Sequence, residues 1–172
     1  HLIAKINSFG WDFWKVLSRD FYNKNILTKI KKTDKKTYIS TGFSSMAEIR
    51  KLNKTFGKNG YYIHTSLSHK YEDINLNAIM EMKGNINKNK IAFGLHSPDI
   101  KILYYAQIFN PESSFFYVKT NENIKFPDND HAIKIGDINS VLNNLKLINI
   151  SIGKGRKQKI FLKDKFDTGK IK

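Results

Sequence analysis

Five short apolar runs recur along the 172-residue chain, and each is followed by a stretch with helical spacing. The runs begin about 25 residues apart, at 13–18, 37–42, 61–66, 90–97 and 114–120. Their apolar residues are nearly continuous rather than alternating, which is typical of strands in a parallel sheet covered on both faces. The repeat therefore predicts an α/β fold of right-handed β-α-β units. Five such units fit either a doubly wound sheet or part of an eight-stranded barrel, and periodicity does not choose between them.

The segments between the runs carry helix signals. Ser45, followed three residues later by Glu48, forms a capping box at the start of one of them. The predicted helices cover 24–32, 44–56, 72–84 (ending at Gly84), a stretch with Pro98 in its first turn, and 137–149. Residues 1–152 are thus predicted to form one domain, and the basic, glycine-punctuated residues 153–172 a tail or linker.

Polar side chains gather where each predicted strand ends. Ligands of parallel α/β folds bind at the carboxyl ends of the strands, so these side chains are expected to face one site. The set combines cations, hydroxyls and carboxylates, which suits an anionic, phosphorylated or carboxylated ligand. Its members are Lys15, Ser18, Arg19, Asp20, Ser40, Thr41, Gly42, His64, Thr65, Ser66, Ser68, His96, Ser97, Lys119, Thr120, Asp128, Asp130 and His131.

The chain is strongly basic, with 30 Lys and Arg against 15 Asp and Glu and a formal charge of +15. Such a charge is common in proteins that bind nucleic acids or membrane surfaces. The lysines are scattered rather than gathered in one arm, however, which favours a general bias in composition. We therefore expect no nucleic acid and no membrane partner, and keep a basic nucleic-acid-binding module as an alternative that salt-dependent binding would reveal. The absence of cysteine excludes thiolate metal ligands and a Cys nucleophile.

Several strand ends together resemble those of the bacterial sialic acid synthase family. The piece FWKVLSRDFYNKNILTKIKKTDKKTYISTGFSSMAEI is similar in its Lys-x-x-Ser and its Ser-Thr-Gly, and IHTSLSHKYEDINLNAI, DNDHAIKIGDINSVL and GKGRK resemble later parts of the family. The similarity covers about residues 11 to 157. It implies a (β/α)8 TIM-barrel type fold, of which this chain matches strands 4 to 8 only, as a partial barrel. The start at His rather than Met fits the expectation of a piece of a longer protein.

The resemblance also implies an activity. Members of the family condense phosphoenolpyruvate with an N-acetylated hexosamine to make a nine-carbon acidic sugar, and a divalent metal, Mn or Mg, orients the sugar aldehyde. The implied enzyme is cytoplasmic and, when full length, a homodimer.

Roles for individual residues follow from the same resemblance. Lys15 and Ser18 match positions that hold phosphoenolpyruvate, and Ser40 and Thr41 are the next phosphate candidates, because Gly42 permits close backbone approach. Asp20 and Asp130 match positions that contact the sugar, and Ser68 is the best remaining polar candidate for substrate binding in a loop shortened by about two residues.

The metal site departs from the family pattern. His96 matches a metal-binding His, but the second metal-binding His falls on Lys119. A protonated Lys does not ligate, and one His alone makes a poor divalent site. Lys119 would instead place its cation where the metal charge sits, and there polarise a carbonyl or hold a carboxylate. The alternative function is therefore a divergent or inactive synthase-like domain that binds an anionic sugar or phosphate without metal-dependent catalysis.

Overall fold

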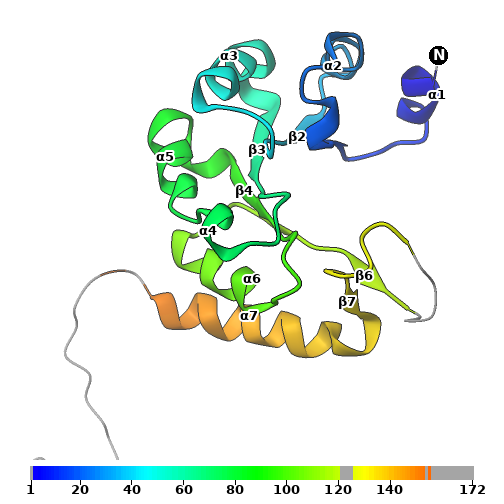
Figure 1. Cartoon of the computed structure of the whole chain (residues 1–172). Coiled ribbons are helices and arrows are strands. Elements are labelled where there is room, and N and C mark those ends of the chain that lie inside the picture. The colour runs from blue at the N-terminus through cyan, green and yellow to red at the C-terminus, as the bar shows by residue number, and fades with distance from the viewer. Residues whose placement is uncertain (1, 121–125, 154, 156–172) are drawn as a thin grey trace, which may run out of the picture.

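The computed structural model describes residues 2–120, 126–153 and 155. Its main sheet has five strands, paired in the order in which they occur in the chain and all parallel. They are β1 (Phe13–Val16), β2 (Lys36–Ser40), β3 (Gly60–His64), β4 (Ile91–Gly94) and β5 (Ser114–Phe115). The order never reverses, so the sheet lacks the switch point of a doubly wound fold and curves as a half barrel (Figure 1). The α/β, barrel-type prediction is confirmed to this extent, and the assignment to strands 4 to 8 stays a prediction.

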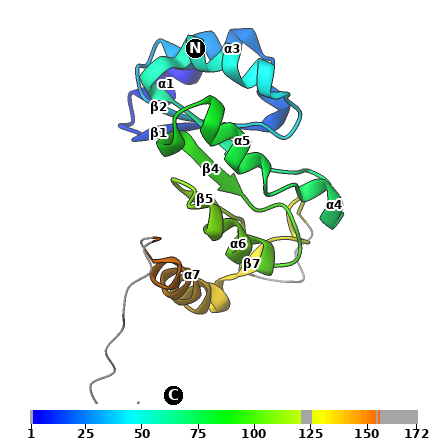
Figure 2. The same cartoon turned by 90° about the vertical axis from the view of Figure 1, so that its left-hand side faces the viewer.

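Helices connect the strands and pack on one side of the sheet (Figure 2). They are α1 (Leu2–Asn7), α2 (Lys24–Lys31), α3 (Met46–Phe56), α4 (Tyr71–Ile74), α5 (Ala78–Asn85), α6 (Lys101–Ala106) and α7 (Ile138–Ile152). The predicted capping box is confirmed: the Ser45 hydroxyl accepts a hydrogen bond from the Glu48 amide, and the Glu48 carboxylate accepts one from the Ser45 amide at 2.8 Å. In the part of the chain that the structure describes, no helix has both the length and the apolar character needed to cross a bilayer.

Two predicted helices differ from the structure, and one predicted segment lies mostly outside the described residues. The helix predicted over 72–84 is divided into α4 and α5, because Asn75 between them adopts a left-handed φ of 44°. The helix expected to hold Pro98 in its first turn begins only at Lys101. Most of the predicted tail, 154 and 156–172, lies outside the described residues.

The fifth apolar run, 114–120, is not one strand. The carbonyl of Phe115 accepts a hydrogen bond from the Leu95 amide at 2.9 Å, which ends the pairing with β4. The carbonyl of Tyr117 accepts instead from the Ile133 amide at 2.8 Å, and a separate two-stranded parallel sheet begins there. Its strands are β6 (Val118–Lys119) and β7 (Ile133–Lys134). The chain thus exchanges one partner for another within a few residues, which an apolar run alone does not predict.

Strand side chains alternate between two apolar clusters. Successive side chains of a strand point to opposite faces of its sheet, and neighbours in β2 obey this: Ile39 joins the large cluster with the helices, and Tyr38 the small one. The small cluster contains Tyr38, Ile63 and Ala92, with Tyr61 and Phe115 packed against them. Apolar side chains therefore line both faces of the sheet, but the helices cover one face only, and the small cluster lies on the other, concave face.

A carboxylate links two strands that are not neighbours in the sheet. Glu112, just before β5, accepts hydrogen bonds from the Lys36 ammonium at 2.8 Å and from the Tyr38 hydroxyl at 2.9 Å, both on β2. Ser113 donates to the same carboxylate at 2.6 Å. With β3 and β4 lying between, this connection spans the concave face and favours one curvature of the sheet.

The Glu112 contacts predict a dependence of stability on pH. Burial alone would raise the pKa of Glu112, but hydrogen bonds from Lys36, Ser113 and Tyr38 outweigh it and hold the pKa below the ordinary 4.5. The stabilisation is therefore present above about pH 4.5 and is lost as the pH falls through the lower folded-state pKa. We expect the free energy of unfolding to fall more for the wild type than for Glu112→Gln between pH ~6 and ~3, measured by urea denaturation.

The matched control is Glu72→Gln, which removes the charge of an exposed carboxylate in α4. Its pH dependence should follow that of the wild type. Equal losses of stability for the wild type and Glu112→Gln would show that the Glu112 link contributes nothing to the curved sheet.

Candidate functional site

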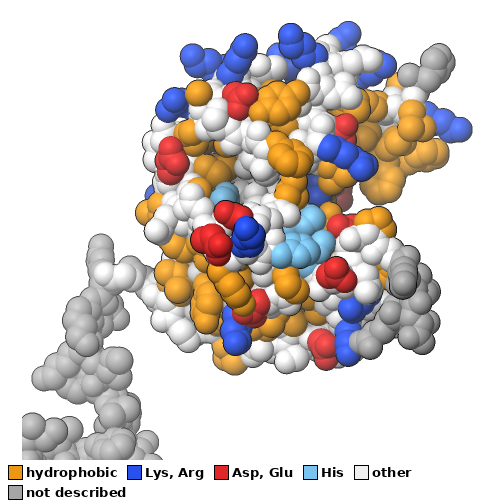
Figure 3. Space-filling view, viewed as in Figure 1, with side chains coloured by type: hydrophobic (Ala, Val, Ile, Leu, Met, Phe, Trp, Pro, Cys, Tyr) orange, Lys and Arg blue, Asp and Glu red, His pale blue; other side chains and the backbone are white. Residues whose placement is uncertain are grey.

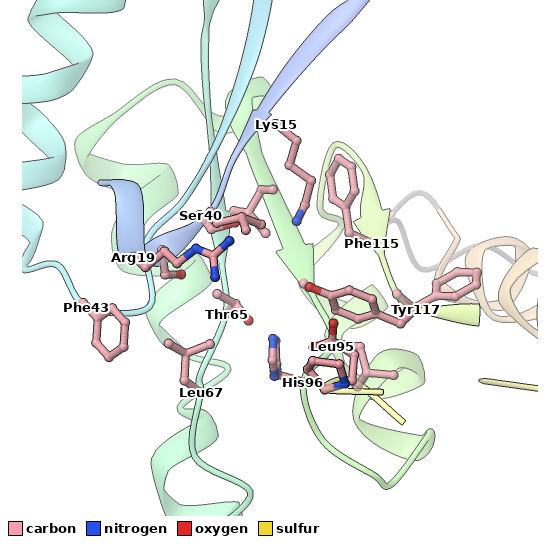
Figure 4. Close-up of a pocket in the computed structure, with 17 residues that line it drawn as sticks. Lys15, Arg19, Ser40, Phe43, Thr65, Leu67, Leu95, His96, Phe115 and Tyr117 are labelled. Atoms are coloured by element: carbon pink, nitrogen blue, oxygen red, sulfur yellow. The ribbon is translucent and has the colours of Figure 1, made fainter. Parts of the chain in front are cut away.

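A pocket of about 620 Å³ opens at the carboxyl ends of the five main strands. Its walls come from every one of these strands or from the residues that follow them (Figure 4). The polar lining residues are Lys15, Ser18, Arg19, Ser40, Thr65, His96, Tyr117 and Asp128. The strand ends therefore meet at one site, as the sequence predicted.

The pleat of the sheet explains why a lysine occurs inside an apolar strand. Lys15 pairs in register with Tyr38, whose side chain lies on the concave face. Alternation then places Ser40, two residues beyond Tyr38, on the same face and nearer the carboxyl edge. In Figure 4 the Lys15 side chain extends into the pocket beside Phe115, and its ammonium lies 5.9 Å from the centre of that ring.

Two cations and one carboxylate set the electrostatics of the pocket. Although Lys15 as a whole is exposed on the edge strand, desolvation of its ammonium lowers its pKa, and the charge of Asp128 offsets part of this effect. The Arg19 guanidinium is exposed and points toward the same space (Figure 4). Lys15 and Arg19 outnumber the single lining carboxylate, so the pocket favours an anion.

Buried hydroxyls form the floor of the pocket. The Ser18 hydroxyl accepts a hydrogen bond from the Gly42 amide at 3.2 Å. The Thr65 side chain is 7% exposed, and its hydroxyl has no hydrogen-bond partner. A buried hydroxyl without a partner costs about 1–3 kcal/mol, so the Thr65 hydroxyl is available to a ligand that enters the pocket.

Three imidazoles meet beside the pocket, and one of them, that of His96, lines it. His96 follows β4, His131 precedes β7, and His69 comes from the loop after β3. Each offers one nitrogen, and these three nitrogens lie within 4.8 Å of one another. Figure 3 shows histidine side chains gathered near the middle of this face, between carboxylates and apolar side chains. We call His69, His96 and His131 the histidine cluster.

Desolvation favours the neutral form of two imidazoles in the cluster, those of His96 and His131. Desolvation lowers the pKa of His96, and the neighbouring His131 lowers it further. Desolvation likewise lowers the pKa of His131, against the opposing charge of Asp128, whose carboxylate oxygen lies 3.4 Å from His131 Nε2. That approach is close enough for an ion pair but is not aligned as a hydrogen bond, since both ring nitrogens of His131 lack a partner.

The site residues predicted from the sequence are divided between two neighbouring pockets and their surroundings. Lys15, Ser18, Ser40 and His96 line the main pocket together. Lys119 and Asp130 line a neighbouring pocket of about 420 Å³, and Leu95 borders both. Lys119 donates a hydrogen bond to the Asn129 carbonyl at 3.1 Å.

Three of the predicted residues line neither of these two pockets. Asp20 forms a 3.8 Å ion pair with Arg19, which does line it. The Thr41 hydroxyl donates to the Ile63 carbonyl at 2.9 Å, and the Ser68 hydroxyl accepts from the Lys70 amide at 3.2 Å. Both hydroxyls thus stabilise local backbone.

Several site residues were not singled out from sequence. Thr65, Asp128 and His131 were only members of the long polar set, and Tyr117 and His69 were outside it. The signal for His131 was its place directly after Asp130, inside the quoted segment DNDHAIKIGDINSVL. No local pattern marks His69, because its partners are distant in the sequence.

Fold and site together define a class of protein: a barrel-type α/β domain with a pocket at the carboxyl ends of its strands, lined by more cations than carboxylates. The chain belongs to the NeuB family, whose model matches residues 1–157. The resemblance to sialic acid synthases is thereby confirmed.

The chain aligns with only part of the length of each curated relative. An uncharacterised protein of Methanocaldococcus jannaschii is 26% identical over 162 residues, which are 88% of this chain and 47% of that protein. The N,N'-diacetyllegionaminic acid synthase of Campylobacter jejuni is 22% identical over 161 residues, with 89% and 48% covered. The chain thus spans about half the length of these curated relatives.

A solved structure supports the fold. The N-acetylneuraminic acid (sialic acid) synthetase of Leptospira borgpetersenii, crystallised with citrate, superposes with a TM-score of 0.79 at 20% identity. The match covers 89% of this chain and 55% of that one. At this sequence identity, the structural similarity supports the barrel-type fold only.

The close packing of the pocket floor predicts a difference between two glycines. A Cβ on Gly42 would lie 2.9 Å from the Ser18 hydroxyl oxygen and 3.3 Å from the Thr65 carbonyl oxygen. Gly42→Ala should therefore lower the free energy of unfolding by roughly 1–3 kcal/mol, measured by urea denaturation. Gly84→Ala, in α5, meets nothing within 4 Å and should be neutral or stabilising by about 0.5–1 kcal/mol. Equal stability of Gly42→Ala and the wild type would contradict a tightly packed floor.

Proposed function

We propose that this chain is the part of a synthase barrel that binds phosphoenolpyruvate and an N-acetylated hexosamine, and that the complete protein condenses them to a nine-carbon acidic sugar. The observation that carries the proposal is the main pocket, where two cations and an unpaired buried hydroxyl converge at the carboxyl ends of parallel strands. Membership of the NeuB family supports it.

The anionic substrate fits the main pocket. Phosphoenolpyruvate carries a phosphate and a carboxylate, and Lys15 and Arg19 supply one cation for each. The hydroxyl of Thr65 and the buried hydroxyl of Ser40 would donate to the remaining oxygens. The Ser18 hydroxyl accepts a hydrogen bond from the Gly42 amide, and its own proton would be donated to a phosphate oxygen.

The sugar would occupy the boundary between the two pockets. Asp130 and Lys119 line the neighbouring pocket, and a carboxylate there would accept hydrogen bonds from sugar hydroxyls. The Lys119 ammonium donates a hydrogen bond to the Asn129 carbonyl at 3.1 Å, and its other protons would hold carbonyl oxygens of the substrate. Asp20 would orient the Arg19 guanidinium through their ion pair. Thr41 and Ser68 would stabilise the backbone of the loops that surround the site.

The proposed reaction joins C3 of phosphoenolpyruvate to the aldehyde carbon of the open-chain sugar, whose oxygen takes a proton. Water adds to the cationic C2, and loss of inorganic phosphate leaves a 2-keto acid of nine carbons. Developing positive charge at C2 is favoured beside Asp128, the carboxylate that lines the pocket. When bound, the divalent metal that the family implies would polarise the aldehyde, and the neutral imidazoles near the pocket suit it as ligands.

The test is condensation by the full-length protein that contains this chain. Phosphoenolpyruvate and a panel of N-acetyl hexosamines are supplied with Mn²⁺, and phosphate release and product mass are measured. Lys15→Met should lower kcat/KM at least about tenfold, because a charge-assisted hydrogen bond contributes about 1.5–3 kcal/mol. The control Lys58→Met removes an exposed lysine beside the opposite end of β3 and should not change kcat/KM. Wild type that is folded but produces no condensation product would contradict the proposal.

Lys119 favours a second candidate function. The resemblance expects a metal-binding His at this position, and a domain that binds an anionic sugar or phosphate without condensation would tolerate the change. This second function would be supported if the wild type binds inorganic phosphate, if Lys15→Met abolishes that binding, and if no condensation is detected. Turnover in the wild type would exclude it.

A further inference from the structure

Tyr117 lines the main pocket but takes no part in the steps proposed above. It lies where the chain leaves β5, and its carbonyl accepts a hydrogen bond from the Ile133 amide at 2.8 Å, which fixes its backbone. Phe115, two residues earlier, packs on the concave face. Alternation along the extended chain directs Tyr117 to the same side. Figure 4 accordingly shows the Tyr117 ring inside the pocket, between Lys15 and His96.

The ring of Tyr117 is held in place, but its hydroxyl is available to a ligand. The rings of His96 and His131 pack nearly perpendicular to it, at 79° and 82°, with centroids 5.7 and 5.2 Å away. These contacts involve the ring alone. Among the residues that the structure describes, none forms a hydrogen bond with the Tyr117 hydroxyl. A fixed ring with an unused O–H is suited to donate to a substrate oxygen.

The position of Tyr117 relates it to the reacting atoms. Tyr117 borders the main pocket, whereas His131, which packs against its ring, borders the neighbouring pocket. The hydroxyl therefore belongs to the boundary where C3 of phosphoenolpyruvate would meet the aldehyde carbon of the sugar. A tyrosine ordinarily titrates near pH ~10, and burial and the charge of Asp128 raise the pKa of Tyr117. The hydroxyl thus keeps its proton and acts as a donor.

We propose that Tyr117 is a catalytic residue whose hydroxyl donates a hydrogen bond to the aldehyde oxygen of the sugar; this inference rests on the proposed function. The C2=C3 electron pair of phosphoenolpyruvate forms the new carbon–carbon bond, and the carbonyl pair moves to the aldehyde oxygen.

The hydrogen bond from Tyr117 strengthens as negative charge develops on that oxygen. Water then adds its oxygen to C2, and the proton that it releases passes to the alkoxide. The bond from C2 to the phosphate ester oxygen breaks, the new C2 hydroxyl gives its proton to the departing phosphate, and a ketone remains. Tyr117 keeps its proton throughout. Because its hydrogen bond is strongest in the transition state, it raises kcat rather than substrate affinity.

The test is Tyr117→Phe in the full-length protein, which removes the hydroxyl and keeps the ring against His96 and His131. With phosphoenolpyruvate, an N-acetyl hexosamine and Mn²⁺, kcat should fall on the order of 100-fold, as for a lost oxyanion donor. The KM of each substrate should change by less than about twofold. Tyr71→Phe is the control, because it removes an exposed tyrosine hydroxyl that donates to the Asp99 carboxylate at 2.8 Å, and its kcat should equal that of the wild type.

The possible outcomes separate this inference from the proposed function. Tyr117→Phe that retains the kcat of an active wild type would overturn the role of Tyr117 and leave the proposed function standing. An unchanged kcat with a raised KM for phosphoenolpyruvate would also overturn it, by showing that the hydroxyl binds the other substrate. A folded wild type without turnover would overturn both. Urea denaturation checks that the variant is folded, and if it is not, Tyr117→Met, which also lacks a donor, is assayed in its place with the same expected loss.

Discussion

Parallel pairing in chain order is the constraint on which the rest of this structure depends. Because β1 to β5 run the same way, all of their carboxyl ends lie at one edge of the sheet. The pleat then sends every second side chain to the concave face. Lys15 and Ser40 reach a common pocket for this reason, although they are far apart in the sequence. Strand direction and register fix the position of the site, and the individual side chains then determine its chemistry.

The site also requires a curved sheet, and contacts at the opposite end of the strands stabilise this curvature. The small cluster around Tyr38, Ile63 and Ala92 fills the concave face. Glu112 joins β5 to β2 across it. A flatter sheet would separate these groups and would also widen the distance between Lys15 and Tyr117 at the carboxyl edge. Packing at one end and ligand binding at the other are thus coupled through the same concave surface.

Local signals predicted much of the fold. The capping box at Ser45 and Glu48 and the alternation of strands and helices depend on residues close in sequence, and both were correct. Strand order was left open by periodicity, because a doubly wound sheet uses the same repeating units. The break after Phe115 was missed, since the choice between β4 and β7 as partner is made by tertiary contacts.

The candidate site was predicted in part for the same reason. Lys15, Ser18, Ser40 and His96 stand at strand ends and were found by position alone. The histidine cluster joins three separate loops, so no spacing in the sequence marks it. Lys119 was singled out because it occupies a place in a motif, whereas His69 has no such local signal.

The central claim is that one edge of the half barrel holds an anion and a metal side by side. The most direct measurement is a crystal structure of the full-length protein with phosphoenolpyruvate and Mn²⁺, recorded at the manganese absorption edge. The account predicts phosphate density in hydrogen-bond contact with Lys15 and Thr65, and an anomalous peak between His69, His96 and His131. Phosphate bound elsewhere, or manganese held without these imidazoles, would contradict it.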